Sequence, residues 1–383
     1  MEADPPPPAS ALMEELVEEV LLRSPPADPA SLVRAALVCR RWRRIVTGPR
    51  FRRRYRDLHL HRGGSPSPPM LGFLSSAGAG TRFVPTSTFR PAPLFGGWRA
   101  LDARHGRALL RRDTGRDAPV DCQLAVWDPA TGRRTDLPRL PWSPHYPYSW
   151  NAAVLCSAST AAACDHLDCS GRGGGHFLVV VVGTNHAEMF AHFYSSETGT
   201  WSAPASARHP DDNVDFAPSA LAGNALYFAF QTGAAALEFD LRTREMAVVR
   251  LPPPRFDWQR VVLSARDDGR LGLATAGKST IYLWAREAPS RGDGNWVQTR
   301  AIELDTLLPA GAISAFPDVV SFVDGVGVVF VRTGDGLFTI DLKSLQVTKV
   351  SRDTAFSSIF PYISFHTPAM EVASTGEGPS SGA

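Results

Sequence analysis

LMEELVEEVLLRSPPADPASLVRAALVCRRWRRI, from Leu12 to Ile45, is the stretch that decides how this chain is organised. Its first part, Leu12 to Leu22, places apolar residues and glutamates at the spacing of a short amphipathic helix. Ser24-Pro25-Pro26 ends that helix, because proline has no N–H, and Asp28-Pro29 begins another. The helical period continues to Thr47-Gly48-Pro49, where it ends. Three helical pieces bury little core, which favours either a cap on the following domain or a module that docks a partner.

The residue types in this stretch resemble an F-box. The matching positions are Leu12-Met13, Leu16, Val20-Leu21, Ser24-Pro25, Asp28-Pro29 and Val38-Cys39-Arg40-Arg41-Trp42-Arg43. Met13, Ser24 and Pro29 depart from the usual pattern. The resemblance implies that the module docks a Skp-type adaptor, which joins it to cullin and RING subunits. The implied adaptor contacts, or supports of the contact surface, are Leu12, Leu16, Val20, Leu21, Pro25, Leu37 and Trp42.

Composition and charge narrow the class of protein. The chain has 383 residues, of which 44% are hydrophobic, and its net charge of +2 implies no general attraction to nucleic acid. Ten arginines and no acidic residue lie between Arg34 and Arg56, which we interpret as a solvated helix face beside an acidic partner rather than a nucleic-acid patch. Five cysteines indicate a reducing compartment. We expect no signal peptide and no membrane span, and a soluble protein of the cytoplasm and/or nucleus.

From Met70 onward the helical period gives way to short strands bounded by Gly, Pro and Asp. One strand phrase recurs five times, and it ends in a small or acidic residue: LAVWD (124–128), HFYSS (192–196), ALEFD (236–240), IYLWA (281–285) and LFTID (337–341). Two of the gaps between successive phrases are 44 and 45 residues, and the longer gaps contain insertions. A period in the mid-forties with about four strands per unit predicts an all-β propeller with five countable blades.

A propeller must close its ring to hide its edge strands. LGFLSS (71–76) and TRFVPT (81–86) from one end of the chain, with YISFHT (362–367) from the other, form a predicted sixth blade. The repeats resemble the kelch-like propellers attached to plant F-box proteins, although most lack the Gly-Gly doublet of a kelch unit. A pair of β-sandwiches is the structural alternative. We expect a disordered tail at 1–9, the helical domain at 10–61, a linker at 62–69, the propeller at 70–368 and a second disordered tail at 369–383.

No constellation in the sequence supports catalysis or metal binding. Cys164 to Cys169, CDHLDC, has the residue types of a zinc site but lacks the second cysteine pair, so we interpret it as a loop. Gly171 to Gly175 precedes a strand rather than a helix, which is unlike a phosphate-binding loop. We therefore predict no catalytic residue, no metal site and no cofactor.

The connections from the outermost strand of one blade to the innermost strand of the next lie on one face of a propeller. Several are rich in aromatic residues, which are common anchors at binding surfaces. The predicted substrate-binding residues are Tyr146, Trp150, Asp212, Phe216, Phe256, Trp258 and Phe316. The alternative is that these aromatic side chains begin inner strands and pack between blades.

These features predict a non-catalytic substrate-recognition subunit of an SCF-type ubiquitin ligase, whose F-box docks the adaptor and whose propeller binds an unknown protein target. One alternative is an F-box scaffold that acts outside a ligase. Another is a propeller enzyme such as a sugar hydrolase, which requires carboxylates that converge around the central channel.

Overall fold

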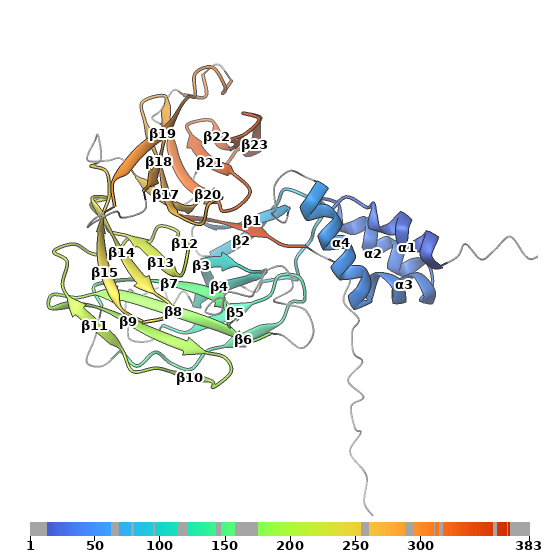
Figure 1. Ribbon diagram of the computed structural model, residues 1–383, viewed down its shortest axis with the longest axis horizontal. Coiled ribbons are helices and arrows are strands. Elements are labelled where there is room, and N and C mark those ends of the chain that lie inside the picture. The colour runs from blue at the N-terminus through green and yellow to red at the C-terminus, as the bar shows by residue number, and fades with distance from the viewer. Residues whose placement is uncertain are drawn as a thin grey trace, which may run out of the picture.

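Helices occupy the first part of the chain and strands the rest, as Figure 1 shows. The computed structural model describes residues 14–62, 69–77, 80–94, 96–112, 122–142, 147–157, 175–253, 260–287, 294–309, 311–313, 317–354, 358–365 and 367. Within them lie four helices and six antiparallel sheets. The predicted order of a small all-α domain and an all-β propeller with six blades is confirmed.

The helical domain has one helix more than the sequence analysis predicts. Its helices are α1 (Glu14–Leu22), α2 (Pro29–Val38), α3 (Arg40–Thr47) and α4 (Pro49–Arg62). The predicted helix end at Thr47-Gly48-Pro49 is confirmed, because α3 ends at Thr47, but the fourth helix that begins at Pro49 was not predicted. Proline fits the first position of a helix, because the N–H at that position has no partner within the helix.

A single extended residue separates α2 from α3. Cys39 has φ −159° and ψ 165°, and its sulfur accepts a hydrogen bond from the backbone N–H of Trp42 at 3.4 Å. The thiol thus caps the new helix, although sulfur is a weak acceptor. This break redirects the chain so that α3 packs back against α2 and α4.

The fourth helix completes the core of the helical domain. Phe51 and Tyr55 of α4 are buried among the apolar side chains of the other three helices. The Tyr55 hydroxyl donates to the carbonyl of Ser24 at 2.9 Å, at the turn that follows α1. On the surface, Arg54 contacts Glu18 at 2.7 Å and Glu19 at 3.1 Å. Part of the arginine-rich stretch therefore faces the acidic side of α1.

Five blades contain a series of four strands in sequential order that begins with the innermost strand, and one of these blades has a fifth strand. They are β3 (Trp98–Arg104), β4 (Arg107–Arg112), β5 (Leu124–Trp127) and β6 (Arg134–Asp136); β7 (Ser149–Cys156), β8 (Phe177–Thr184), β9 (Glu188–Ser195) and β10 (Thr200–Trp201), with β11 (Ala205–Arg208) also paired to β9; β12 (Ala220–Ala222), β13 (Ala225–Ala229), β14 (Ala235–Asp240) and β15 (Met246–Arg250); β16 (Val261–Ala265), β17 (Leu271–Gly277), β18 (Thr280–Arg286) and β19 (Trp296–Glu303); and β20 (Asp318–Val323), β21 (Val328–Thr333), β22 (Gly336–Asp341) and β23 (Val347–Ser351). The recurring sequence phrase falls in the third strand of each of these five blades.

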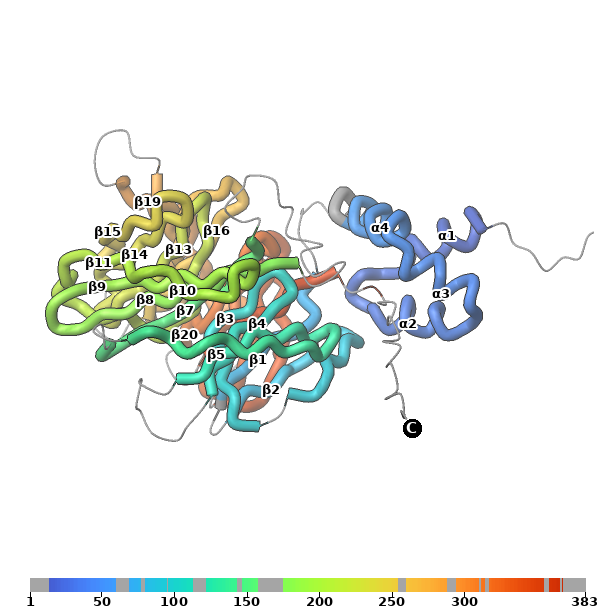
Figure 2. Tube along the Cα trace, turned by 90° about the horizontal axis from the view of Figure 1, so that it is seen from below, coloured from blue at the N-terminus to red at the C-terminus, as the bar shows by residue number. Residues whose placement is uncertain are grey.

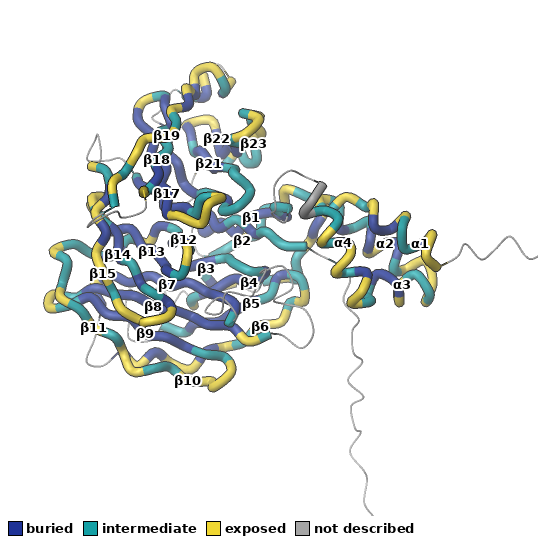
Figure 3. Tube along the Cα trace, viewed as in Figure 1, coloured by how far each residue is buried: buried dark blue, intermediate teal, exposed yellow. Residues whose placement is uncertain are grey.

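The sixth blade joins both ends of the propeller. It contains β1 (Met70–Ala77), β2 (Gly80–Pro85) and β24 (Ser358–Ile363), in the order β2-β1-β24. β24 is the inner strand, because it lies between β20 and β3 of the two neighbouring blades. Figure 3 shows that the strands near the centre of the propeller are buried, whereas exposed residues gather on outer strands and turns.

The acidic residue at the end of the third strand forms a tight turn. In the third blade, Oδ1 of Asp240 accepts hydrogen bonds from the backbone N–H groups of Arg242 at 2.7 Å and Thr243 at 2.8 Å. Asp128 and Asp341 accept equivalent pairs of N–H groups in their own blades. This Asx turn starts the fourth strand, which explains why the acid recurs with the repeat.

The helical domain contacts the propeller beside the closing blade, on one side of the propeller in Figure 2. Phe365, two residues beyond β24, packs against the helical core, and its ring centroid lies 6.4 Å from that of Tyr55. Thr88 follows β2; its hydroxyl donates to Asp28 at 2.5 Å and accepts from the N–H of Ala30 at 3.4 Å. A propeller residue therefore caps α2.

Replacing Asp240 with alanine removes the acceptor of two backbone N–H groups. We expect Asp240→Ala to lower the free energy of unfolding by about 1 kcal/mol. Asp240→Asn is the matched control, since its side-chain oxygen can accept the same bonds, and we expect it to lose less than half as much. Urea unfolding followed by tryptophan fluorescence measures both. Equal losses in the two variants would contradict the Asx-turn explanation.

Candidate functional site

Two helices of the N-terminal domain expose apolar ridges. Leu16 and Val20 lie one turn apart on α1, with 53% and 64% of their surface exposed. Val33 and Leu37 have the same spacing on α2, where Leu37 is 79% exposed, and Val38 is also exposed. Large apolar side chains grouped in this way favour a protein partner. We call these five residues the docking ridges.

The predicted adaptor residues divide between this surface and the core. Leu16, Val20 and Leu37 are exposed, and so is Pro25. Trp42 is partly buried against the helical core. Leu21 is only 5% exposed and packs inside the domain, so it is a core residue rather than a contact. Leu12 lies outside the described residues. Val33 and Val38, which the predicted set lacks, belong to the exposed surface.

The propeller has a cavity of about 390 Å³ in its central channel. It is lined from the ends of five inner strands, β3, β12, β16, β20 and β24, and from the turns that follow β3, β16 and β20. Pro218 and Ser219, which lead into β12, also belong to the wall.

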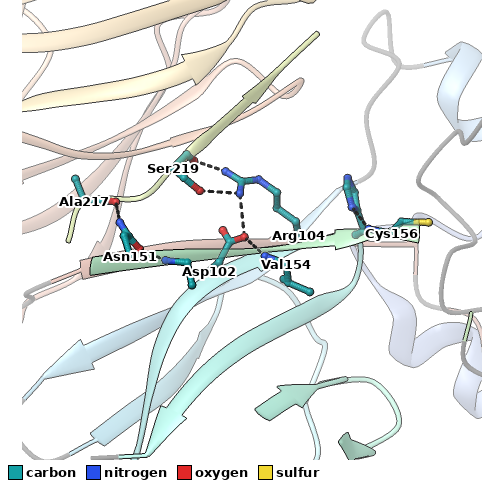
Figure 4. A network of polar contacts seen from close by, with 9 residues as sticks. Asp102, Arg104, Asn151, Val154, Cys156, Ala217 and Ser219 are labelled. Atoms are coloured by element: carbon teal, nitrogen blue, oxygen red, sulfur yellow. Dashed lines mark hydrogen bonds and ion pairs between the residues drawn. The ribbon is translucent and has the colours of Figure 1, made fainter. Parts of the chain in front are cut away.

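A polar network crosses from blade to blade beside this cavity, as Figure 4 shows. Asp102 of β3 accepts a hydrogen bond from the N–H of Val154 in β7 at 2.9 Å and pairs with Arg104 at 2.9 Å. Arg104 reaches a third blade, where it donates to the hydroxyl and the carbonyl of Ser219. Asn151 of β7 donates to the carbonyl of Ala217 at 2.8 Å. These bonds hold three consecutive inner strands together.

A second carboxylate lies across the channel. Asp324 directly follows β20, and its Oδ1 accepts from the N–H of Ala265 in β16 at 2.9 Å. Burial raises the pKa of Asp324 from its ordinary value of 3.8 to about 6, although Arg104 lowers this pKa in part. Burial likewise raises the pKa of Asp102, against the opposing effect of Arg104. Both carboxylates therefore serve as acceptors between blades and carry a desolvation cost.

The structure separates the predicted substrate-binding residues. Trp150 is the second residue of β7 and packs against Trp142 in the core between blades, with a centroid distance of 5.7 Å. Asp212 is partly buried and accepts from the hydroxyl of Thr232 at 2.5 Å. Phe216 is 52% exposed and is open to a partner. The remaining four lie outside the described residues and stay predictions: Tyr146, Phe256, Trp258 and Phe316.

The described part of the chain contains no group of three or more His, Cys, Asp or Glu side chains arranged to hold a metal ion. The CDHLDC segment, Cys164 to Cys169, lies outside it, as does most of the glycine run from Gly171 to Gly175. None of the described helices has the length and apolar character needed to cross a membrane.

Comparison with known proteins gives two family matches. Residues 10–54 match the F-box domain, and residues 99–370 match the family described as F-box protein AT5G49610-like, beta-propeller. F-box protein At5g03970 of Arabidopsis thaliana is 23% identical over 297 residues, which cover 70% of this chain and 64% of that protein. The match thus spans slightly less than two thirds of its length.

Comparison with solved structures finds matches of low similarity. A protein from Lactobacillus plantarum has a TM-score of 0.42 and 12% identity, over 74% of this chain and 82% of that one. The periplasmic gluconolactonase of Pseudomonas aeruginosa has a TM-score of 0.39 and 16% identity, over the same shares. At these scores neither likeness bears on function. The family matches do, since the propeller family covers well over half of the chain: this protein belongs to the AT5G49610-like β-propeller family of F-box proteins and carries its F-box at residues 10–54.

Proposed function

We propose that this protein is a substrate receptor of an SCF-type ubiquitin ligase. In this role the F-box docks a Skp-type adaptor, which links the chain to cullin and RING subunits, and the propeller captures a target protein. F-box domains generally bind Skp1-type adaptors, and F-box proteins with propellers are generally non-catalytic adaptors. The observation that carries the proposal is the set of exposed docking ridges on an F-box whose own core is already complete.

The apolar residues of the ridges are not needed to fill the helical core. Val17, Leu22 and Leu32 are buried within it, whereas Leu16, Val20 and Leu37 point away. Each exposed large apolar side chain gains about 1.5–3 kcal/mol when a partner buries it fully. An adaptor that covers both ridges is the simplest source of that burial.

The contacts between the F-box and the propeller support a receptor of fixed geometry. The Tyr55–Phe365 contact and the Asp28–Thr88 hydrogen bond both cross between the two domains. A target held on the propeller would then lie at a set distance from the adaptor. Such an arrangement accelerates transfer by raising the effective concentration of target near the ligase's reactive partner, without any catalytic residue in this chain.

The channel carboxylates agree with a receptor better than with a propeller hydrolase. A glycosidase needs one carboxyl group free to act as acid and another free to act as base or nucleophile. Asp102 instead accepts from both Val154 and Arg104, and Asp324, which keeps one open oxygen, uses the other to accept from Ala265, so this pair does not supply two free carboxyl groups. We place the working protein in the cytoplasm and/or nucleus, where a ubiquitin ligase acts.

Substitution of the ridge on α1 tests the proposal. We expect the double variant Leu16→Asp, Val20→Asp to weaken binding of a purified Skp-type adaptor by roughly a hundredfold, which corresponds to about 3 kcal/mol. The reason is that charges replace two apolar side chains that the adaptor would bury. Isothermal titration calorimetry of the full chain measures the affinity.

The matched control carries the same two changes on the propeller. Val248 of β15 and Val297 of β19 are exposed to a similar degree, at 40% and 42%. Val248→Asp, Val297→Asp should bind the adaptor as the wild type does. Failure of the intact wild-type chain to bind any Skp-type adaptor would refute the ligase assignment.

A further inference from the structure

Two polar atoms in the channel cavity have spare hydrogen-bonding capacity. Ser321 of β20 is only 1% exposed, and within the described residues its hydroxyl has no hydrogen-bond partner. Asp324, three residues further, uses Oδ1 for the N–H of Ala265. Its Oδ2 has no partner among the side chains and backbone groups that the structure describes. Both residues line the cavity. Asp324 is partly buried, whereas the Ser321 hydroxyl is fully buried, and a buried hydroxyl is normally paired.

The charges that line the cavity leave a negative excess. Three aspartates and two arginines contribute to the wall: Asp102, Asp267, Asp324, Arg104 and Arg266. Arg104 pairs with Asp102 at 2.9 Å, and Arg266 pairs with Asp268, just outside the wall, at 3.4 Å. No ion pair to a described residue compensates Asp267 or Asp324. A cation in the cavity would therefore be attracted to the Asp324 side of the channel.

Apolar side chains make up the remaining wall. Leu263 and Phe360 are buried along the inner strands β16 and β24, and Leu221, Pro361 and Ile363 are partly buried beside them. The volume of about 390 Å³ is at the small end of the range for ligand pockets. Such a wall suits a narrow aliphatic stem that carries a polar head.

We propose that this cavity binds an ammonium group carried on an aliphatic stem, with Asp324 and Ser321 as its acceptors. An ammonium group is a compact cation with several N–H donors, so it can donate to the open Oδ2 of Asp324 and to the Ser321 hydroxyl together. A guanidinium group fits less well, because it binds best to both oxygens of one carboxylate. The assignment of this ammonium to a lysine of a captured target rests on the proposed function, but the site itself does not.

The test uses small probes and the full chain. Nα-acetyl-lysine N-methylamide carries the ammonium and stem, and the norleucine analogue carries the same stem without charge. We expect the lysine probe to bind at least tenfold more tightly than the norleucine probe, and also more tightly than the arginine analogue, in isothermal titration calorimetry or saturation-transfer NMR. Equal binding of lysine and norleucine probes would overturn the proposal.

Variants localise the binding. Asp324→Asn keeps an oxygen acceptor for the Ala265 N–H but removes the charge, and Ser321→Ala removes only the hydroxyl. Each should weaken the lysine probe about tenfold, as expected for loss of a charge-assisted hydrogen bond. The control Asp335→Asn removes a carboxylate that pairs with Lys349 outside the cavity, and it should leave binding unchanged. Unchanged binding in both cavity variants would likewise overturn the proposal.

Two further measurements distinguish a lysine of a protein from a small amine as the ligand, and distinguish failure of the cavity site from failure of the ligase assignment. A lysine-containing peptide that binds more tightly than 1,5-diaminopentane supports a protein ligand, whereas the reverse supports the same site with a small amine as its ligand. Adaptor capture without lysine-probe binding would sink this inference alone. Lysine-probe binding without adaptor capture would leave the site standing and sink the ligase assignment.

The pH dependence of stability gives an independent prediction. Burial raises the pKa of Asp324 to about 6, so the folded protein holds this proton more tightly than the unfolded chain does. Ionisation as the pH rises from about 4 to about 6 therefore lowers stability. The groups around Asp324 are Asp102, Arg104, His105, Arg266 and Asp267. Asp324→Asn should raise the thermal midpoint relative to wild type at pH 7.5, and this gain should vanish at pH 4. A lower midpoint at pH 7.5 would contradict the raised pKa.

Discussion

Pairing between β1 and β24 is the constraint on which the structure depends. These strands come from opposite ends of the propeller, and their register brings Leu74 opposite Phe360. Without this pairing, the ring would expose two edges and the central channel would have no complete wall. Closure also determines which inner strands face one another across the channel. The cavity, its charges and its apolar wall are therefore consequences of one long-range strand pair.

The F-box is attached at this same closure. Pro69 precedes β1 and accepts from the N–H of Ser364, which directly follows β24. The next residue, Phe365, enters the core of the helical domain. The docking ridges are thus oriented by contacts that exist only when the ring is closed. In the proposed receptor, a loosely tethered F-box would let the target and the adaptor sample many separations, whereas this arrangement would restrict them.

Local signals in the sequence explain why the fold was largely predictable. In three blades the third strand ends in an aspartate that accepts hydrogen bonds from backbone N–H groups of the turn that follows. The sequences LAVWD, ALEFD and LFTID therefore mark the ends of their own strands. Pro49 misled the prediction, because proline follows one helix as readily as it begins another. Periodicity placed Leu16 and Leu21 on an apolar helix but could not tell an exposed ridge from the core. The channel site was beyond prediction: Asp102, Ser219 and Asp324 meet only through closure of the ring.

Burying charged groups in the channel costs desolvation free energy, so their presence there needs an explanation other than stability. A buried ion pair such as Asp102–Arg104 rarely improves on a well-packed apolar pair of the same volume. Here each charged group also fixes a neighbouring strand, through Val154, Ser219 or Ala265. The bonds specify how the blades meet, which an apolar channel would leave less defined. Asp324 uses one carboxylate oxygen to accept from the N–H of Ala265 in the neighbouring blade, and its other oxygen stays open. The residue that positions two blades therefore also places a negatively charged acceptor in the cavity.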